Sequence, residues 1–275
     1  MTQRLANKLE GLRQVWAFDN RWQLLLYRLL FPHERLSIYR LGDLEILVDH
    51  AAGDANGARE VLTTSMYTEH LARLQVSAPV NVLDLGANNG GFALLLKHLG
   101  IPVERIVCVE LNPRTCMRLQ FNLDRNIDAP HEVLNAAVCA RSGSLAIHVG
   151  AGDVGDNIYG GSAADSRQEV VPAITFDEIF IERFGRDAVL DLCKIDIEHA
   201  EYEVFASPGH DLVDRCRFLI IEIHRGEGEH PERLVEYLGS RGFELLPRGS
   251  DPDVYALRNR AHQRHVVATE DAVAG

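Results

Sequence analysis

Paired cysteines are missing from this sequence. Its 275 residues include five cysteines, an odd number, and no two of them form a C-x-x-C pair. This pattern argues against a disulfide framework and against a zinc site. Several of the cysteines lie in or beside apolar runs, so we expect buried, reduced thiols and a cytoplasmic location. The five are Cys108, Cys116, Cys139, Cys193 and Cys216.

Positive charge is scarce as well. The chain carries 28 lysines and arginines against 40 aspartates and glutamates, a formal net charge of −12. Nucleic acids and anionic lipid headgroups attract proteins through a positive field. We therefore expect neither nucleic acid nor a membrane as a partner, whereas a small neutral or cationic substrate fits this charge.

The chain also lacks an apolar run of the roughly 20 residues that a membrane-spanning helix needs. The apolar stretch at residues 24–31 is interrupted by Arg28, and the charged N-terminus has no signal-peptide cleavage site. Apolar residues in this region nevertheless recur at helical spacing. We expect an amphipathic helical face that packs on the domain or on a second subunit of a homodimer, with membrane docking ranked below both. The face comprises Trp16, Phe18, Trp22, Leu25, Leu26 and Leu29.

Strand and helix patterns alternate through most of the chain. Residues 1–78 read as an extension with a helix, a β-hairpin at 36–40 and 44–48, and a helix at 60–74. Residues 79–258 read as the main domain, and 259–275 as a mobile tail. The predicted strands of the main domain are 80–83, 105–110, 131–138, 144–149, 189–195, 218–223, 243–246 and 254–257. Its predicted helices start near 91 and span 113–126, 175–184, 199–205 and 232–240, and residues 150–165 form a long loop or lid.

Alternating strands and helices with right-handed crossovers predict an α/β fold, a doubly wound, mainly parallel sheet. Ligands of such sheets bind in the crevice at the carboxyl ends of the strands. The residues that carry chemistry in this sequence follow predicted strands, as the fold requires.

The turn at residues 84–92 follows the first strand of the main domain. Gly86 and Gly90 let a ligand approach the backbone, and the next helix begins with free N–H groups. A dinucleotide site has G-x-G-x-x-G here, but this turn has Asp84 before its glycines and Asn88 at the second glycine position. Asp84 would repel a pyrophosphate and attract the ammonium group of S-adenosylmethionine. We therefore predict S-adenosylmethionine as the cofactor.

Further cofactor contacts are predicted at the ends of the next two strands. Glu110 lies 24 residues beyond Gly86, where a carboxylate accepts hydrogen bonds from ribose hydroxyls, with Leu111 beside it. The small residues at 135–137 leave room for an adenine ring, and they are Asn135, Ala136 and Ala137. Tyr67 and Glu69 are candidates to close over the cofactor amino group, although surface positions on a helix explain them equally well.

Acids and histidines gather at the ends of the fourth and fifth strands. They are Asp196, Glu198, His199, Glu222 and His224. One mechanism uses His199 or His224 as the general base for a hydroxyl acceptor. In a second, Asp196 and Glu222 hold Mg²⁺, which lowers the pKa of the acceptor oxygen. The two can operate together, and the alternative is that these are helix caps and satisfied polar groups.

In combination, several motifs resemble those of the FkbM-type S-adenosylmethionine-dependent methyltransferases. The resemblance extends from about residue 80 to 246, and it rests on segments 84–90, 109–113, 135–138, 174–177, 194–198 and 221–224. It implies a class I, Rossmann-like sheet of seven strands with one antiparallel strand. It also implies O-methylation of a small-molecule hydroxyl, on a sugar, polyketide or other natural product.

The chain departs from the family pattern at one position. His199 stands where the family commonly has glycine after Asp-x-Glu. The spacing from Asp196 is similar to metal-dependent sugar O-methyltransferases, in which a histidine base follows a metal-binding aspartate. On this resemblance we rank His199 narrowly above His224 as the base.

Three other functions are compatible with the sequence. A carboxylate O-methyltransferase would need no strong base, because its acceptor is already ionised. An NAD-dependent oxidoreductase would use the same fold, and a non-catalytic methyltransferase-like module would dimerise through residues 16–31.

Overall fold

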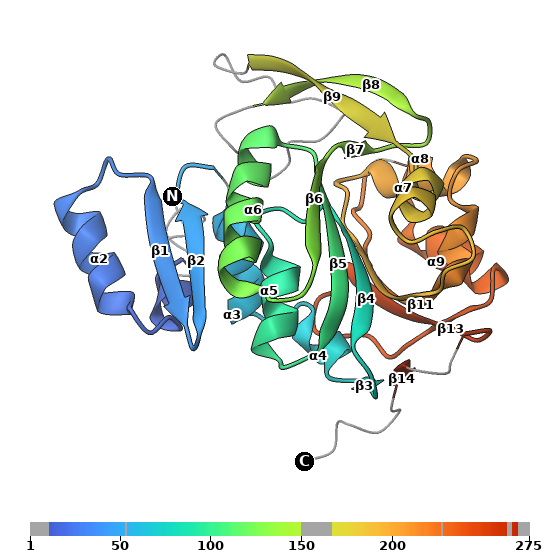
Figure 1. Ribbon diagram of the computed structural model, residues 1–275, viewed down its shortest axis with the longest axis horizontal. Helices are drawn as coiled ribbons and strands as arrows, with labels where there is room; N and C mark the ends of the chain where they lie inside the picture. The colour runs from blue at the N-terminus through green and yellow to red at the C-terminus, as the bar shows by residue number, and fades with distance from the viewer. Residues whose placement is uncertain (1–10, 53, 150–166, 227, 263–265, 269–275) are drawn as a thin grey trace.

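A seven-stranded sheet forms the centre of the computed structural model, which describes residues 11–52, 54–149, 167–226, 228–262 and 266–268 (Figure 1). The strand order is β12-β13-β11-β10-β4-β5-β6, and β13 is the antiparallel member. This is the predicted Rossmann-like arrangement. The strands are β4 (Val80–Leu85), β5 (Val103–Glu110), β6 (His131–Asn135), β10 (Leu190–Ile195), β11 (Cys216–Glu222), β12 (Phe243–Leu245) and β13 (Val254–Asn259).

Helices cover both faces of the sheet, as Figure 1 shows. One core lies under α5 (Gly91–His98), α6 (Pro113–Asn126) and the N-terminal extension. The second core lies under α7 (Phe176–Arg183), α8 (Ala200–Ala206) and α9 (Pro231–Ser240). Parallel strands that are covered on both sides carry apolar residues on both faces. β4, β5, β10 and β11 therefore contribute side chains to both cores. The cysteines of the chain are free thiols, and four of the five are buried.

The N-terminal extension packs beside α6. It contains α2 (Arg21–Leu30) and a hairpin of β1 (Leu36–Leu41) and β2 (Leu44–Asp49), which confirms the predicted hairpin. Asn122 and Asn126 of α6 pair with the backbone of β2, with N–H···O distances of 2.7–3.1 Å. These bonds satisfy backbone groups on the hairpin and fix it to the main domain.

The predicted helix at 60–74 is wrong as a single element. The chain forms α3 (Glu60–Thr63), then α4 (Thr68–Leu71), then β3 (Leu74–Val76). Thr64 is extended at φ −117° and ψ 170°, which ends α3. The break brings Met66 and Tyr67 to a cavity at the carboxyl ends of the central strands. Tertiary contacts therefore override the helical periodicity here.

Two further differences concern strands. The predicted strand at 131–138 is divided, because β7 (Ala137–Val138) leaves the main sheet and pairs with β9 (Arg167–Ile174). β9, which the sequence analysis missed, also pairs with β8 (Gly143–Val149). Part of the predicted tail is paired as well, since β14 (Val266–Ala268) lies antiparallel to β3. The predicted lid at 150–165 lies outside the described residues.

Among the described residues, no helix has both the length and the apolar character that crossing a bilayer would require.

Candidate functional site

The turn between β4 and α5 has the backbone conformation that its sequence predicts. Gly86, Asn88 and Gly90 all have positive φ, at 74°, 46° and 96°. Gly86 is also confined in space, because a Cβ there would lie 1.6 Å from the carbonyl oxygen of Asp196. The turns after β4 and β10 are therefore in direct contact, and only glycine allows this approach.

Glu110 closes the other side of this turn. Its carboxylate accepts hydrogen bonds from the backbone N–H of Asn88 at 2.9 Å and of Asn112 at 2.7 Å. Burial raises the pKa of Glu110 to about 7, against the lowering effect of these two hydrogen bonds. A carboxylate fixed in this way is prepared to accept further hydrogen bonds from a diol, the role predicted for it.

Asn135 holds the segment that follows Glu110. Its side-chain amide donates to the carbonyl oxygens of Glu110 at 3.0 Å and Leu111 at 2.8 Å. Ala136 and Ala137 are buried beside it. Asn135 thus positions the predicted ribose-binding residues, and the adenine site at residues 135–137 stays a prediction.

Asp84 does not line the cavity described below; instead it pairs with a lysine. It is fully buried, and its Oδ1 lies 3.4 Å from Nζ of Lys194. Lys194 also lies 3.3 Å from Asp196 Oδ2 and donates to the Gly86 carbonyl oxygen at 2.6 Å. Burial raises the pKa of Asp84, and the Asp196 and Asp84 carboxylates raise the pKa of Lys194 despite its burial. Asp84 therefore lies in a buried ion pair with Lys194, and its direct contact with a cofactor ammonium stays a prediction.

A cavity of about 290 Å³ lies at the carboxyl ends of β4, β10 and β11. Residues of the N-terminal extension form one part of its wall, and acidic side chains that follow β10 and β11 form another. The lining residues are Gly57, Glu60, Val61, Met66, Tyr67, Gly86, Ala87, Asn88, Gly91, Phe92, Lys194, Asp196, Glu198, Glu222 and His224.

His224 is surrounded by four carboxylates. Its Nε2 lies 3.5 Å from Glu198, 3.7 Å from Glu222 and 3.9 Å from Asp196. Its Nδ1 lies 3.3 Å from Oε1 of Glu201, a fully buried acid that the sequence analysis missed. Glu201 lies on the first turn of α8, and only the fold brings it beside the end of β11.

These carboxylates set the charge of His224. Burial by itself would lower the pKa of this imidazole, but the Glu201 hydrogen bond and the Asp196 and Glu198 carboxylates raise it to about 9. Burial and the Asp196 charge raise the pKa of Glu222 to about 8. These contacts favour the imidazolium form of His224 at neutral pH, and in that form it offsets part of the negative charge of the cavity.

His199 lies behind this cluster. Its ring is 5.2 Å from that of His224, and its Nδ1 lies 3.1 Å from Glu229. It is not among the described residues that line the cavity. His199 and Glu198 have positive φ, at 73° and 51°, in the left-handed region that favours glycine. The positive φ explains why glycine suits position 199. Since His224 lines the cavity and His199 does not, the geometry favours His224, and which histidine is the base stays a prediction.

The predicted Mg²⁺ ligands are only partly brought together. Among the described residues, the group with metal-ligating atoms within 4.8 Å of one another is Asp196, Glu201 and His224. Glu222 is not part of this group, although it lies on the same wall of the cavity. Mg²⁺ binding by Asp196 and Glu222 stays a prediction.

The two residues proposed to close over the cofactor lie in different places. Tyr67 lines the cavity, and its hydroxyl donates to Glu222 at 3.0 Å. Its ring packs edge-on against Phe92, with centroids 5.5 Å apart. Glu69 instead accepts from the backbone N–H of Ser250 at 2.7 Å and is not among the described lining residues. Tyr67 keeps its predicted place, and Glu69 does not.

Comparison with known proteins gives one sequence match and several structural ones. The Methyltransferase FkbM domain matches residues 84–245, more than half of the chain. No curated protein matches the sequence significantly. Methyltransferase FkbM from Methylobacillus flagellatus KT is 16% identical with a TM-score of 0.45, covering 66% of this chain and 43% of its own. Ribosomal protein L11 methylase from Lactobacillus delbrueckii subsp. bulgaricus is 10% identical, with a TM-score of 0.41 and coverage of 72% and 79%. TYW2 of M. jannaschii, solved with AdoMet, is 15% identical, with a TM-score of 0.40 and coverage of 82% and 84%.

Proposed function

Since this chain belongs to the FkbM methyltransferase family, we propose that it transfers a methyl group from S-adenosylmethionine to a hydroxyl of a small, uncharged molecule, with His224 as general base. The observation that carries the proposal is the position of His224 among four carboxylates in the cavity that the Gly86 turn also lines. When bound, S-adenosylmethionine supplies a methyl group that its sulfonium makes electrophilic.

The residues around the β4 turn fit this cofactor. The left-handed glycines at 86 and 90 leave the backbone accessible, and the fixed Glu110 carboxylate suits the ribose hydroxyls. The Asp196 carboxylate suits an ammonium and a sulfonium, because both are cationic. A cation bound there would also favour the charged form of Glu222, whose pKa burial and Asp196 raise to about 8. Lys194 orients Asp196 from behind and holds the two turns together.

The acidic wall also supports a choice of acceptor. A hydroxyl compound such as a sugar donates hydrogen bonds that carboxylates accept. Negative charge is already disfavoured here, because burial and the Asp196 carboxylate raise the pKa of Glu198, and raise that of Glu222 to about 8. A carboxylate acceptor would meet the same burial and the same Asp196 charge. We therefore place a hydroxyl acceptor ahead of the carboxylate alternative. In its neutral form, His224 would take the hydroxyl proton at Nε2 as the oxygen–methyl bond forms and the sulfur–methyl bond breaks, which leaves S-adenosylhomocysteine. The neighbouring carboxylates stabilise the imidazolium that results.

The experiment that tests this function is an acceptor screen with methyl-labelled S-adenosylmethionine, run with added Mg²⁺ and with EDTA. We expect a labelled product that survives mild alkali, since methyl ethers resist conditions that hydrolyse methyl esters. His224→Gln should lower kcat by about 10²- to 10⁴-fold, the range for loss of a general base. His199→Gly is the matched control, and it should keep most of the activity because glycine accepts the positive φ at this position.

Other outcomes would point elsewhere. An alkali-labile product, with full activity in His224→Gln, would favour the carboxylate alternative. Loss of activity in His199→Gly but not in His224→Gln would restore His199 as the base. S-adenosylhomocysteine binding without turnover on any acceptor would favour the assembly-module alternative, and dependence on Mg²⁺ would favour the metal-assisted route.

A further inference from the structure

α2 carries an apolar face that nothing in the described part of the chain covers. Along this helix, Leu24 is its buried residue, whereas Trp22 is 65% exposed and Leu29 is 77% exposed. Trp16 packs edge-on against Trp22, with ring centroids 4.9 Å apart. We call this surface the α2 face, and it comprises Trp16, Trp22, Leu26, Leu29, Leu30 and Phe31, each at least half exposed.

The members of the α2 face form a continuous stripe. Positions 22, 26, 29 and 30 follow the i, i+4, i+7, i+8 spacing, which places them on one side of a helix. The sequence predicted a face of Trp16, Phe18, Trp22, Leu25, Leu26 and Leu29 that packs on the domain or on a second subunit. Phe18 and Leu25 do pack on the domain core, whereas the α2 face does not. Its exposure shows that the described part of this chain does not supply the packing surface.

The charges beside this stripe are positive. Arg21 and Arg28 lie together on one flank of the helix, and α2 contains no acidic residue. The guanidinium of Arg21 lies 5.7 Å from the ring centroid of Trp16, so a cation borders the aromatic pair directly. Over residues 11–36 the chain has four arginines and two acids. Arg35 pairs with Asp49, and the other three arginines still leave a small positive excess, the opposite sign to the net charge of −12.

We propose that the α2 face docks on an anionic membrane surface, with its apolar stripe at the level of the headgroups and acyl chains and its arginines on lipid phosphates. Amphipathic helices that lie in a bilayer interface have this composition, with tryptophan, phenylalanine and leucine on one side and basic residues at the border. Tryptophan suits this environment because its ring is apolar and its N–H is polar.

The charges favour lipid over a second copy of the chain. A symmetric pair of α2 helices would place Arg21 and Arg28 of both copies in one apolar interface, without an acid on either helix to pair with them. Anionic headgroups supply the counter-charges instead. The net charge of the whole chain, on which we excluded a membrane partner, matters less, because charges beyond a Debye length of about 10 Å are screened.

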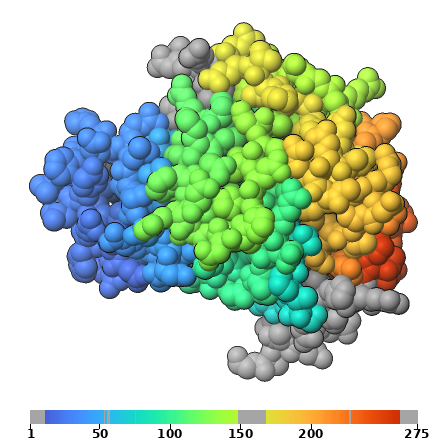
Figure 2. All heavy atoms as spheres, viewed as in Figure 1, coloured from blue at the N-terminus to red at the C-terminus, as the bar shows by residue number. Residues whose placement is uncertain are grey.

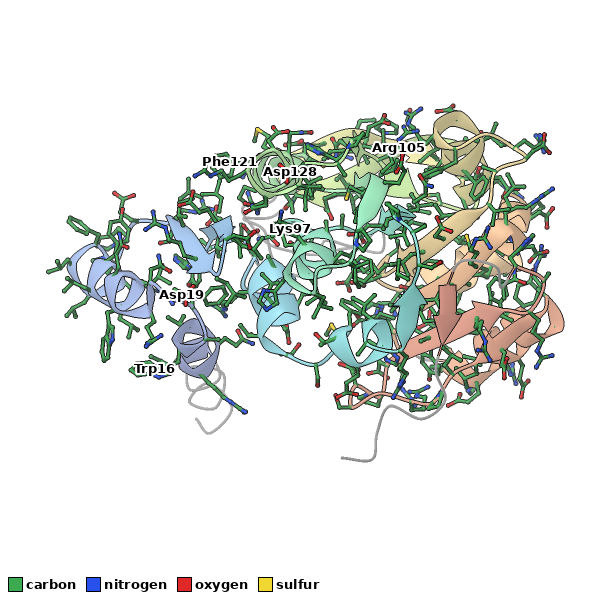
Figure 3. The ribbon with its side chains drawn as sticks, turned by 60° about the horizontal axis from the view of Figure 1, so that its bottom comes forward. Trp16, Asp19, Lys97, Arg105, Phe121 and Asp128 are labelled. Carbon is green, nitrogen blue, oxygen red and sulfur yellow. The ribbon has the colours of Figure 1, made fainter. Side chains whose placement is uncertain are left out.

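The position of the face also allows docking. α2 lies at one end of the molecule, away from β10 and β11 (Figure 1), and the same region forms the blue end in Figure 2. In Figure 3, Trp16 points away from the sheet. A contact made through this end would leave the cavity at the sheet edge open to solvent.

Tryptophan fluorescence offers a direct test, because both tryptophans of the chain belong to the α2 face. We expect a blue shift of the emission when vesicles of phosphatidylcholine and phosphatidylglycerol are added to the full-length protein, and a much smaller shift with phosphatidylcholine alone. Leu26→Glu with Leu29→Glu should abolish the shift while both tryptophans remain. Arg21→Gln with Arg28→Gln should weaken binding to the anionic vesicles by about 30-fold, from roughly 1 kcal/mol for each arginine.

Val170→Glu is the matched control, since Val170 is also exposed but lies on β9, and it should bind vesicles like the wild type. Circular dichroism would show that each variant is folded. The proposal is overturned if no vesicle shifts the emission or if the Leu26 and Leu29 variant still binds. It is also overturned if the shift appears without vesicles on raising the protein concentration, together with a doubled mass in light scattering, because the occupant would then be a second copy.

Discussion

At the scale of single residues, His224 combines the features that a base in this site requires. Of His199 and His224, it is the one that lines the cavity, and carboxylates lie near both of its ring nitrogens. These carboxylates stabilise the protonated form of His224. This assists proton uptake during the reaction, but it leaves little neutral imidazole before the reaction begins. With a pKa of about 9, only about 1% of His224 is neutral at pH 7.

This charge state predicts the pH dependence of the reaction. Because the neutral imidazole is the active form and its pKa is raised, kcat/KM should rise about tenfold per pH unit from pH 7 and level off near pH 9. Initial rates at low acceptor concentration, measured between pH 6 and 10, would establish the profile. A plateau that already begins below pH 7 would contradict the assignment of His224 as the base.

The residue types at strand ends could be read from the sequence, but their pairing could not. Gly86, Glu110 and His224 lie where the alternation of strands and helices places them. The Asp84–Lys194 ion pair depends on the register of β4 against β10, in which these two residues are opposite each other. A sequence pattern specifies which face a residue takes, but not which residue of the neighbouring strand it meets.

At the scale of elements, the N-terminal extension and the main domain act as one structural unit. Asn122 donates to the carbonyl oxygen of Leu47 in β2 at 3.1 Å. It also donates, at 2.8 Å, to that of Asn89 in the turn between β4 and α5, here called the cofactor turn. The backbone N–H of Ala58 donates to Asn89 Oδ1 at 2.7 Å. The extension therefore supports the cofactor turn as well as one wall of the cavity. Nothing in the hairpin sequence reveals this, because the contacts join residues more than 30 positions apart.

A buried ion pair between Asp54 and Arg118 fastens the extension to α6, and it gives a prediction for stability. Asp54 is fully buried and receives two hydrogen bonds from the Arg118 guanidinium, at 2.6 and 2.8 Å. Arg118→Ala should lower the free energy of unfolding by about 3–5 kcal/mol, because it leaves a buried carboxylate without its partner. Urea unfolding followed by circular dichroism would measure the loss.

Arg125→Ala is the control for this experiment. Arg125 also joins α6 to the extension, because it pairs with Glu45 of β2, but its side chain is 58% exposed. Exposed pairs contribute about 0–1 kcal/mol, so this variant should unfold nearly like the wild type. Equal losses in the two variants would show that the Asp54–Arg118 pair does not fasten the extension.

At the scale of the whole molecule, the fold places the acidic cavity and the arginines of α2 in different parts of the structure. Acidic side chains gather at the carboxyl ends of β10 and β11, where the proposed cofactor brings positive charge. The arginines of α2 lie at the opposite end of the molecule (Figure 1). The net charge, which follows from composition alone, agrees with the acidic cavity. It did not predict the arginines of α2, because a net charge hides a local excess of the opposite sign.

The most direct test of the cofactor site is calorimetric titration with S-adenosylhomocysteine, comparing the wild type with Glu110→Gln and with Glu104→Gln, an exposed acid on the same strand. We predict micromolar binding to the wild type and to Glu104→Gln. Glu110→Gln should bind about 10- to 100-fold more weakly, the loss expected when hydrogen bonds to a charged acceptor are removed. No binding to the wild type, or equal binding to all three proteins, would contradict the account.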